Sequence, residues 1–412
     1  GATATCSKDA TFNDNTLTIT APASKESTVA EQITTVKLTK DNVTTTYNIK
    51  VTTEAKTGIP FDPETRYSQL LIDKRTGSFY ANTKPSGINS NSTLGTTLDY
   101  VPGLVAKAMI EAVDYYKDNP AGDITVAKVK GWFDKVQGYG DSHTIKEAGT
   151  KGESFDDLNA VKLYFGLKSV AASKTLSDIT DNTTGWNEKI KSALGGIRTA
   201  NTNYVIKSGT GAADMEGGWW HKKGYVNQMW CDGQYMGTAL LAQMINDDQY
   251  KDGDGGNSVT GTKNGDWDLI CKQLDITWNY LWNDNTKLIH HAFAADKGSA
   301  ETSKMWEFDK DAQGNNNYRN EACWARAAGW YFLALIDVLE QMDKAKYSGS
   351  NYNTIKTHLQ ALANGLMARQ DAETGCWYQL PLYDGTYSAT DCGNGATKTR
   401  VYNYLESSAT AI

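Results

Sequence analysis

The sequence predicts an all-α fold, an α/α toroid, with a small N-terminal β module, and three observations lead to this prediction. Residues 16–20, 34–38 and 45–51 alternate Thr or charged residues with branched apolar ones, which is typical of strands. Later stretches place apolar residues at three- and four-residue spacing, which is typical of helices. These stretches are residues 99–118, 122–138, 155–174, 185–201, 227–247, 264–284, 321–344 and 351–371. Eight long helices exceed a four-helix bundle, and the absence of a fixed 30–50-residue period disfavours a solenoid.

Two domains follow from this pattern, a β module over residues 1–57 and a helical domain over residues 58–412. The alternating strands suggest an immunoglobulin-like module, although about 60 residues is short for a complete sandwich. The longest connections between the predicted helices are rich in Gly, Asn, Asp and Thr and span residues 202–226, 285–320 and 372–403. In a toroid such connections gather at one end, where we expect the binding cleft.

Composition narrows the function classes. The 412 residues carry 41 Lys and Arg against 48 Asp and Glu, a net charge of −7, and no basic stripe indicates a nucleic-acid partner. Twelve Trp and 22 Tyr are a heavy aromatic content, and aromatic faces stack on the C–H faces of sugars. The sequence contains no run of about 18 apolar residues, so it predicts no membrane span.

The cysteines and histidines indicate no metal centre. The six Cys show no zinc spacing, the five His form no HExxH motif, and we expect Cys231, Cys271 and Cys323 to be buried. Cys376 and Cys392 flank one loop and are a candidate disulfide, which suits an oxidising compartment. The chain opens on a lone Gly typical of a cleaved tag, so we expect a removed export signal and a periplasmic, cell-surface or secreted location.

The densest cluster of chemically useful residues is 217–237, where a loop rich in Trp, His and Lys enters a helix. Asp232 shares a helix face with Met229 and Met236. Desolvation on an apolar face raises the pKa of a carboxyl group, and a protonated carboxyl is what a general acid needs. The alternative is a structural Asp that bonds a neighbouring loop.

A second pair of acids begins another predicted helix. Asp156 is explained as a helix cap, whereas Asp157 is in register with Val161 and Tyr164 and is expected to face inward. Two carboxylates from different helices facing one cavity are the usual arrangement for glycoside hydrolysis.

Two more segments place cationic or titratable groups near this cavity. Arg326 lies among Ala, Gly and Trp, and its planar fork suits a substrate carboxylate. An internal salt bridge to Asp156 or Asp157 is the alternative. The His290–His291 pair is a candidate to place an imidazole in the cleft.

The joint order of these motifs resembles glycoside hydrolase family 105, the unsaturated rhamnogalacturonyl hydrolases, and the related family 88 unsaturated glucuronyl hydrolases. The resemblance covers roughly residues 60–412 and implies a six-hairpin (α/α)6 toroid. The motifs are the Asp157 helix, the Trp-His-Lys loop at 220–222, Met-Trp-x-Asp-Gly-x-Tyr-Met at 229–236, His290–His291, Trp-Ala-Arg-x-x-Gly-Trp at 324–330, Trp-Tyr-Gln at 377–379 and Asn-Tyr-Leu-Glu-Ser-Ser at 403–408. Further short helices are expected near 64–73 and after Tyr404, and the resemblance implies an apolar helix where the chain ends at Ile412.

The resemblance also implies a reaction. Such enzymes hydrate the C4–C5 double bond that a lyase leaves on a terminal uronate, and the resulting hemiketal collapses. Asp232 matches the aspartate that protonates C4 and helps to activate water, and Asp157 matches a second aspartate that positions the substrate. The implied substrate-binding residues are His221, Trp220, Trp230, Tyr235, His291, Arg326, Trp330 and Trp377. The partner is an oligosaccharide with a terminal unsaturated uronate, and no metal or cofactor is implied.

The sequence departs from the family pattern around the key acid. Cys231 and Gln234 stand where apolar residues are expected, Ala292-Phe293 replaces Gly-Trp, and Ala327-Ala328 replaces a small residue followed by Asn. Two other hypotheses stay open. One is a conventional mannanase-like toroid glycosidase that uses Asp156 and Asp157, and the other is a non-catalytic glycan-binding protein at the cell surface.

Overall fold

The chain divides into two units, Gly1–Leu70 and Leu71–Ile412, which are described separately. The predicted boundary after residue 57 stays a prediction, because residues 54–96 fall outside the described ranges. The computed structural model describes residues 3–6, 10–13, 16–19, 30–41, 43–53, 97–98, 100–122, 124–251, 262–301, 308–310, 316–320, 323–372, 374–382, 386–387, 401–402 and 404–406.

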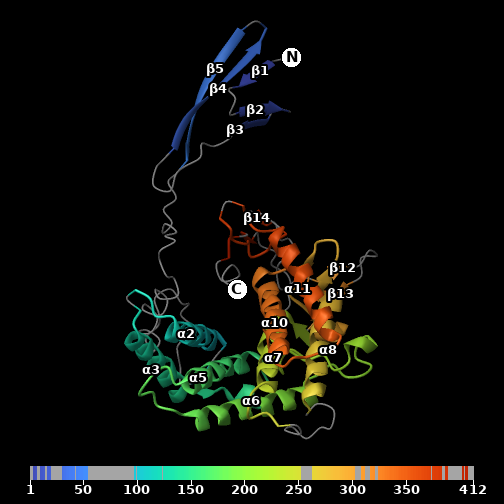
Figure 1. Cartoon of the computed structure of the whole chain (residues 1–412). Helices are drawn as coiled ribbons and strands as arrows, with labels where there is room; N and C mark the ends of the chain where they lie inside the picture. Colours follow the sequence, from blue (N-terminus) through green and yellow to red (C-terminus); the bar gives the residue numbers. More distant parts are fainter. Residues whose placement is uncertain are drawn as a thin grey trace. The chain divides into compact units, whose positions relative to one another are not determined.

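The first unit consists of strands, as predicted. Its three-stranded antiparallel sheet has the order β1-β4-β5, and β2 and β3 form a separate hairpin (Figure 1). The bounds are β1 Thr3–Cys6, β2 Ala10–Asn13, β3 Thr16–Ile19, β4 Ala30–Lys40 and β5 Val43–Thr53. The turn between β4 and β5 includes Asp41 in the left-handed region, at φ 51°. Thr34 and Val36 of β4 are buried.

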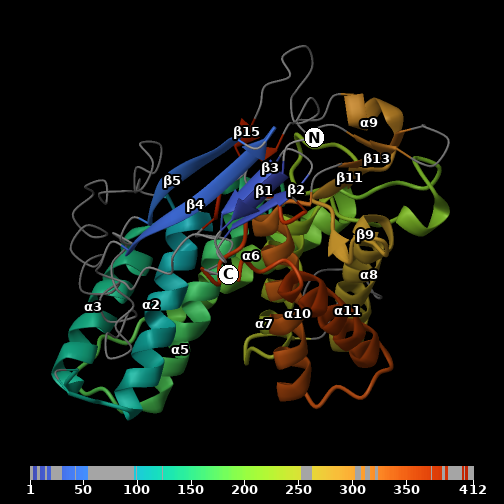
Figure 2. The same ribbon diagram turned by 90° about the horizontal axis from the view of Figure 1, so that it is seen from above.

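The second unit is mainly helical, and all eight predicted helices are present with both ends within seven residues of the expected ones (Figures 1 and 2). The long helices are α2 Tyr100–Asp118, α3 Val126–Ser142, α5 Lys162–Ser173, α6 Thr183–Asn203, α7 Cys231–Ile245, α8 Lys263–Leu281, α10 Ala325–Lys344 and α11 Asn351–Met367. Short helices are α4 Glu147–Thr150, η1 Asp156–Val161, η2 Ala213–Met215 and α9 Lys297–Glu301. The short helices expected near 64–73 and beyond residue 406 lie outside the described residues.

The helices pack as successive pairs, α2 with α3, α5 with α6, α7 with α8 and α10 with α11. The first members of these pairs also pack on one another, because α2 contacts α5 and η1, η1 contacts α7, and α7 contacts α10 (Figure 2). An inner row of helices backed by an outer row is the arrangement of a helical toroid. Within the inner helix α7, every residue except Asp232 and Gln243 is buried.

Short strands lie between the helices of this domain, in addition to the all-α architecture that the sequence predicts. Four of them form a sheet with the order β12-β13-β11-β8. Segments of two to five residues are too short to show a period of two in the sequence. Their bounds are β6 Thr97–Leu98, β7 Thr144–Ile145, β8 Gln228–Trp230, β9 Trp282–Asn283, β10 Leu288–Ile289, β11 Ala292–Ala294, β12 Phe308–Lys310, β13 Asn316–Asn320, β14 Thr386–Tyr387 and β15 Val401–Tyr402.

Among the described residues, no helix combines the length and apolar character needed to cross a membrane. Cys231, Cys271 and Cys323 are buried free thiols, as expected. Cys376 is a half-buried free thiol, and its proposed partner Cys392 lies outside the described residues.

A pair of glycines lets the segment before η1 pack closely on α6. A Cβ on Gly196 would lie 2.3 Å from the carbonyl oxygen of Gly149, and a Cβ on Gly152 would lie 2.4 Å from the carbonyl oxygen of Gly196. Gly152 also has φ of +73°, a conformation that side chains disfavour. This close approach fixes the backbone that leads into Asp156.

We therefore predict opposite effects from alanine at two adjacent positions of α6. Gly196→Ala should destabilise the protein by about 1–3 kcal/mol, because a backbone carbonyl occupies the space of the new methyl group. Gly195→Ala should be neutral or stabilising by up to about 1 kcal/mol, because no atom lies within 4 Å and alanine favours a helix. Urea unfolding followed by circular dichroism measures both, and equal effects would contradict the proposed close contact.

Candidate active site

Strand pairing brings Asp232 and His291 together. Strand β8 pairs antiparallel with β11, placing Trp230 opposite Ala292, and the N–H of Cys231 donates to the carbonyl oxygen of His291 at 3.0 Å. Helix α7 begins at once, so Asp232 lies in its first turn. There the Nε2 atom of His291 lies 3.1 Å from Oδ2 of Asp232.

This acid and imidazole are both accessible and constrained. The Asp232 side chain keeps 18% of its surface exposed and that of His291 9%. The first turn of a helix favours a carboxylate, because unpaired backbone N–H groups point toward it. A carboxyl and an imidazole at hydrogen-bond distance can hold or transfer one proton between them, which is the basic requirement for general acid–base chemistry.

A second acid–imidazole pair is formed by Asp156. The Oδ1 atom of Asp156 lies 3.2 Å from Nε2 of His221, and its Oδ2 contacts the Lys222 ammonium. Burial alone would raise the pKa of Asp156, but the charges of His221 and Lys222 outweigh burial and hold that pKa well below its ordinary value. Asp156 is therefore a permanently charged group and more than a helix cap.

Asp157 points to a different partner. Its Oδ1 lies 3.5 Å from the Nζ of Lys146, and 13% of its side chain is exposed. It follows Asp156 in the first turn of η1, where successive side chains diverge. The two adjacent acids thus differ in their direct contacts, since Asp156 contacts His221 and Lys222 whereas Asp157 lies beside Lys146.

Stacked aromatic rings connect the two acid–imidazole pairs. The ring of Trp230 stacks on His221 at a centroid distance of 5.6 Å and on Tyr225 at 5.0 Å. It meets His291 edge-on at 4.7 Å. Gly233 makes room for this packing, because a Cβ there would lie 2.9 Å from Nδ1 of His221. Trp230 is thus the common neighbour of both histidines.

The other flank of His291 leads to the predicted arginine. His291 packs against Trp324 at 5.0 Å, and the guanidinium of Arg326 lies over the Trp324 ring at 4.2 Å. Arg326 keeps 37% of its side chain exposed and pairs with the buried Glu406 at 3.1 Å. An internal salt bridge therefore exists, but its partner is Glu406 and not Asp156 or Asp157.

Four predicted binding residues lie elsewhere. Tyr235 and Trp330 stack on each other in the core at 5.1 Å with almost no exposed surface, so they support α7 against α10. Trp220 packs against Tyr204 at 5.9 Å. Trp377 donates its indole N–H to the carbonyl of Leu366 at 2.7 Å. Its own carbonyl accepts from the N–H of Glu406 at 2.8 Å, so Trp377 positions the partner of Arg326.

A pocket of about 760 Å³ lies beside the Asp156 pair. Lys146, Lys222, Lys223 and Tyr225 line it together with both aspartates of η1. Tyr225 also stacks on Trp230, so the pocket and the Asp232 pair share one aromatic wall. Lys146, Tyr225, Trp324 and Glu406 were not predicted as site residues, although Tyr225 lies in the 217–237 cluster and Trp324 and Glu406 lie in the motifs at 324–330 and 403–408. No group of three or more metal-binding side chains occurs among the described residues.

The chain is similar to known glycoside hydrolases in sequence and in fold. The family model described as Glycosyl Hydrolase Family 88 matches residues 71–412. A family 105 glycoside hydrolase from C. acetobutylicum is 21% identical and superposes with a TM-score of 0.53, covering 84% of this chain and 74% of its own. A possible family 105 member from Salmonella enterica is 16% identical over 81% and 76% of the two chains, with a TM-score of 0.45. A family 88 glycosyl hydrolase from Bacteroides vulgatus is 15% identical over 77% and 71%, with a TM-score of 0.43.

The fold and the family match define this protein as a glycoside hydrolase on a helical toroid. The chain belongs to glycosyl hydrolase family 88. The resemblance inferred from the order of motifs is thereby confirmed at the level of the family.

The charge environment of Asp156 leads to a prediction about pH. The pKa of an aspartate is about 4 in the unfolded chain, and that of Asp156 is lower in the folded protein. Its charged form therefore stabilises the fold at pH values above about 4. This stabilisation is lost as the pH falls toward the lower pKa of the folded state. Asp156→Asn should therefore cost about 3 kcal/mol at pH 7, because it leaves two cations without their buried partner. The difference in free energy of unfolding between variant and wild type should become smaller as the pH is lowered below about 4. Urea unfolding across a pH series measures this difference.

Asp157→Asn is the matched control. Its single lysine partner is more distant and partly exposed, so the cost should stay below about 1 kcal/mol. A difference for Asp156→Asn that does not change between pH 7 and pH 3 would contradict the charge-locked role.

Proposed function

We propose that this enzyme removes a terminal unsaturated (4,5-ene) uronic acid from lyase-generated oligosaccharides by hydrating the double bond. The observation that carries the proposal is the accessible pair of Asp232 and His291. Helix α7 is almost entirely buried, and Asp232 is the acid in it that is not. Trp230 and Trp324 flank the imidazole and offer flat faces for a sugar ring.

In the proposed reaction Asp232 donates a proton to C4 of the unsaturated ring, and water adds to C5. The carboxylate left on Asp232 accepts a proton from that water, so the acid is regenerated and one water molecule is consumed. The product at C5 is a hemiketal, which opens to a ketone, and C1 then releases the neighbouring sugar as a free hydroxyl. His291 keeps the Asp232 carboxyl oriented through its 3.1 Å hydrogen bond.

Arg326 is the proposed contact for the uronate carboxylate. Trp324 supports one face of the guanidinium and Glu406 pairs with one Nη atom, so these two contacts fix the position of the guanidinium. A planar guanidinium binds a carboxylate through two parallel hydrogen bonds. Holding the carboxylate fixes C5, which carries it, relative to Asp232.

The pocket beside Asp156 is the proposed position of the sugar that remains. Its three lysines are balanced by Asp156, Asp157 and Glu153, and Tyr225 supplies an aromatic face. Such a mixed polar lining suits a hydroxyl-rich ring. In this arrangement Asp157 and Lys146 position the substrate, and Asp156 holds His221 and Lys222 in place.

We predict that Asp232→Asn lowers kcat by a factor of about 10²–10⁴, because the amide has no proton to give at neutral pH. The measurement is the loss of ultraviolet absorbance of the conjugated double bond, followed with a panel of lyase-generated oligosaccharides. The panel member that responds identifies the linked sugar.

Asp157→Asn is the comparison that separates the two glycosidase mechanisms. It should retain a larger share of kcat than Asp232→Asn. Full activity of Asp232→Asn with loss at Asp157, or cleavage of saturated oligosaccharides only, would instead establish the conventional mechanism with adjacent aspartates.

Arg326 generates a prediction about binding. Arg326→Lys keeps the charge but loses the two-pronged geometry, so KM for the unsaturated substrate should rise about tenfold with a smaller change in kcat. Steady-state kinetics by the same absorbance assay measures this. An unchanged KM would remove Arg326 from the substrate contacts.

We also propose that the N-terminal β unit is an immunoglobulin-like module and that the enzyme acts in the periplasm, at the cell surface or outside the cell. The antiparallel sheet β1-β4-β5 and the β2–β3 hairpin support the first point. The location is supported by the extracellular origin of most lyase-treated polysaccharides. Fractionation of cells that express the native gene tests it.

A further inference from the structure

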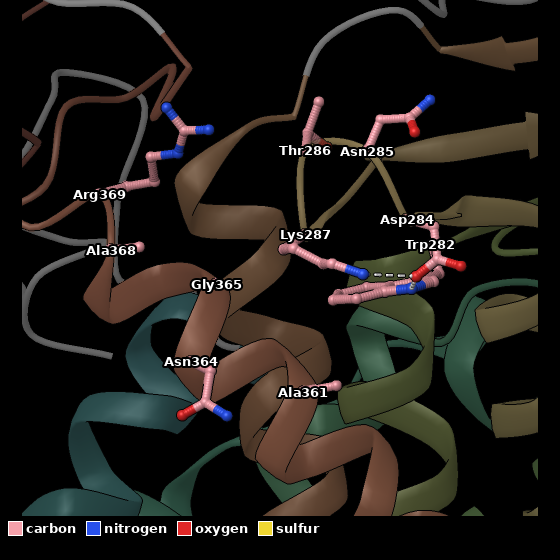
Figure 3. Close-up of a pocket in the computed structure, with 10 residues that line it drawn as sticks. All are labelled: Trp282, Asp284, Asn285, Thr286, Lys287, Ala361, Asn364, Gly365, Ala368 and Arg369. Carbon is pink, nitrogen blue, oxygen red and sulfur yellow. Dashed lines mark hydrogen bonds and ion pairs between the residues drawn. The ribbon is translucent and has the colours of Figure 1, made fainter.

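A second pocket lies apart from the residues around Asp232. It has a volume of about 670 Å³ and opens between the β9–β10 turn and the last turns of α11 (Figure 3). The two elements touch closely, because a Cβ on Gly365 would lie 1.7 Å from the carbonyl oxygen of Lys287. The catalytic proposal uses none of its lining residues.

One wall of this pocket is a rigid aromatic ring. Trp282 lines the pocket and stacks on Trp278 with centroids 4.2 Å apart and an interplanar angle of 14°. Trp278 stacks in turn on His358 at 4.1 Å and 9°. A ring fixed by such a column loses little conformational entropy when a ligand packs against it, and an indole face matches the C–H face of a sugar.

The other walls supply polar groups that the described part of the chain leaves unused. Asn364 comes from α11, Arg369 lies two residues beyond the end of α11, and Asn285 and Thr286 come from the facing turn (Figure 3). The Thr286 hydroxyl is buried and has no hydrogen-bond partner among the described residues. The exposed Arg369 has no ion-pair partner among them either. These groups are a guanidinium, two amides and a hydroxyl, which together match the carboxylate and hydroxyls of an acidic sugar.

The charge of the pocket also favours an anion. Lys287 and Asp284 form an ion pair at 2.9 Å, drawn as a dashed line in Figure 3, and cancel each other. Arg369 is the remaining charged residue of the lining, so the pocket is net positive although the whole chain is net negative. An arginine on the wall opposite Trp282 supplies a planar guanidinium, which suits a carboxylate (Figure 3).

We propose that this pocket is a second carbohydrate-binding site that takes an internal uronate of an acidic oligosaccharide. The choice of a uronate rests on the proposed function, whereas the existence of the site rests on its own geometry. Trp282 contacts the sugar face, Arg369 binds the carboxylate, and Asn285 and Asn364 bind hydroxyls.

The site shares its support with the proposed catalytic pair. Trp282 pairs with Ile289 across the β9–β10 hairpin, and the chain then continues directly into His290 and His291. Nε2 of His290 lies 3.2 Å from Nδ2 of Asn283, which ties the two ends of the hairpin together. A ligand that orders the turn therefore also stabilises the segment that delivers His291 to Asp232.

The test is binding of a saturated tetragalacturonate, which lacks the double bond and so reports binding without the proposed turnover. Titration calorimetry uses the full chain as the Asp232→Asn, Arg326→Gln double variant, in which the proposed uronate contact of the first site is removed. Adding Arg369→Gln should weaken binding about tenfold. Lys356→Gln is the matched control, because it neutralises an exposed cation of α11 away from the pocket and should leave binding unchanged.

Two results would overturn the proposal. One is equal affinity with and without Arg369→Gln, and the other is equally tight binding of a neutral tetrasaccharide of the same length.

Asn364→Ala provides a second, uncharged probe of the pocket and should weaken binding by a smaller factor. In the otherwise wild-type enzyme, Arg369→Gln should leave turnover of a short unsaturated disaccharide unchanged. Failure of that turnover in the wild type would count against the catalytic proposal and leave the binding result standing.

Discussion

The pairing of β8 with β11 is the constraint on which the proposed site depends. Strand β8 ends at the residue directly before α7, and the N–H of Cys231 donates to the carbonyl of His291. The register of the strand pair therefore decides which side chains meet at the start of the helix. A shift of one residue would turn His291 to the opposite face of the strand. The same register places Phe293 opposite Met229 in the core, which makes such a shift costly.

The second constraint is electrostatic. Asp156 and His221 are buried and the partly exposed Lys222 contacts them, so the charged acid compensates for the desolvation of its neighbours. Removing one member leaves a charge without a partner. The resulting loss of folding free energy is larger than the net stabilisation that the intact group provides. The N–H of Phe155 also donates to the carbonyl of His221 at 3.2 Å, so backbone and side chains fix the same loop. Trp230 then packs on a His221 that has little freedom to move.

The helices, the β unit and the family could be predicted because each leaves a long signal in the sequence, either a period or an ordered set of motifs. The choice between Asp156 and Asp157 could not, because it depends on η1 being a 3-10 helix with about three residues per turn, whereas the prediction assumed α-helical register from Asp157 to Val161. Tyr235 and Trp330 were expected in the cleft. The identity of an aromatic residue in a motif does not indicate whether its side chain faces a ligand or a neighbouring helix. Glu406 lies 80 residues from Arg326, and no local pattern connects them.

The contrast between the two acid–imidazole pairs bears on their roles. Asp156 has a histidine and a lysine against its two oxygens, so its charge is compensated from both sides and its lone pairs are occupied. Asp232 has one imidazole on Oδ2 and keeps part of its surface exposed, so its carboxyl remains open to a reacting atom. A group that must give and regain a proton requires that second arrangement, whereas a group that holds a loop in place requires the first. Environment, more than residue type, therefore separates the proposed catalytic role of Asp232 from the proposed supporting role of Asp156.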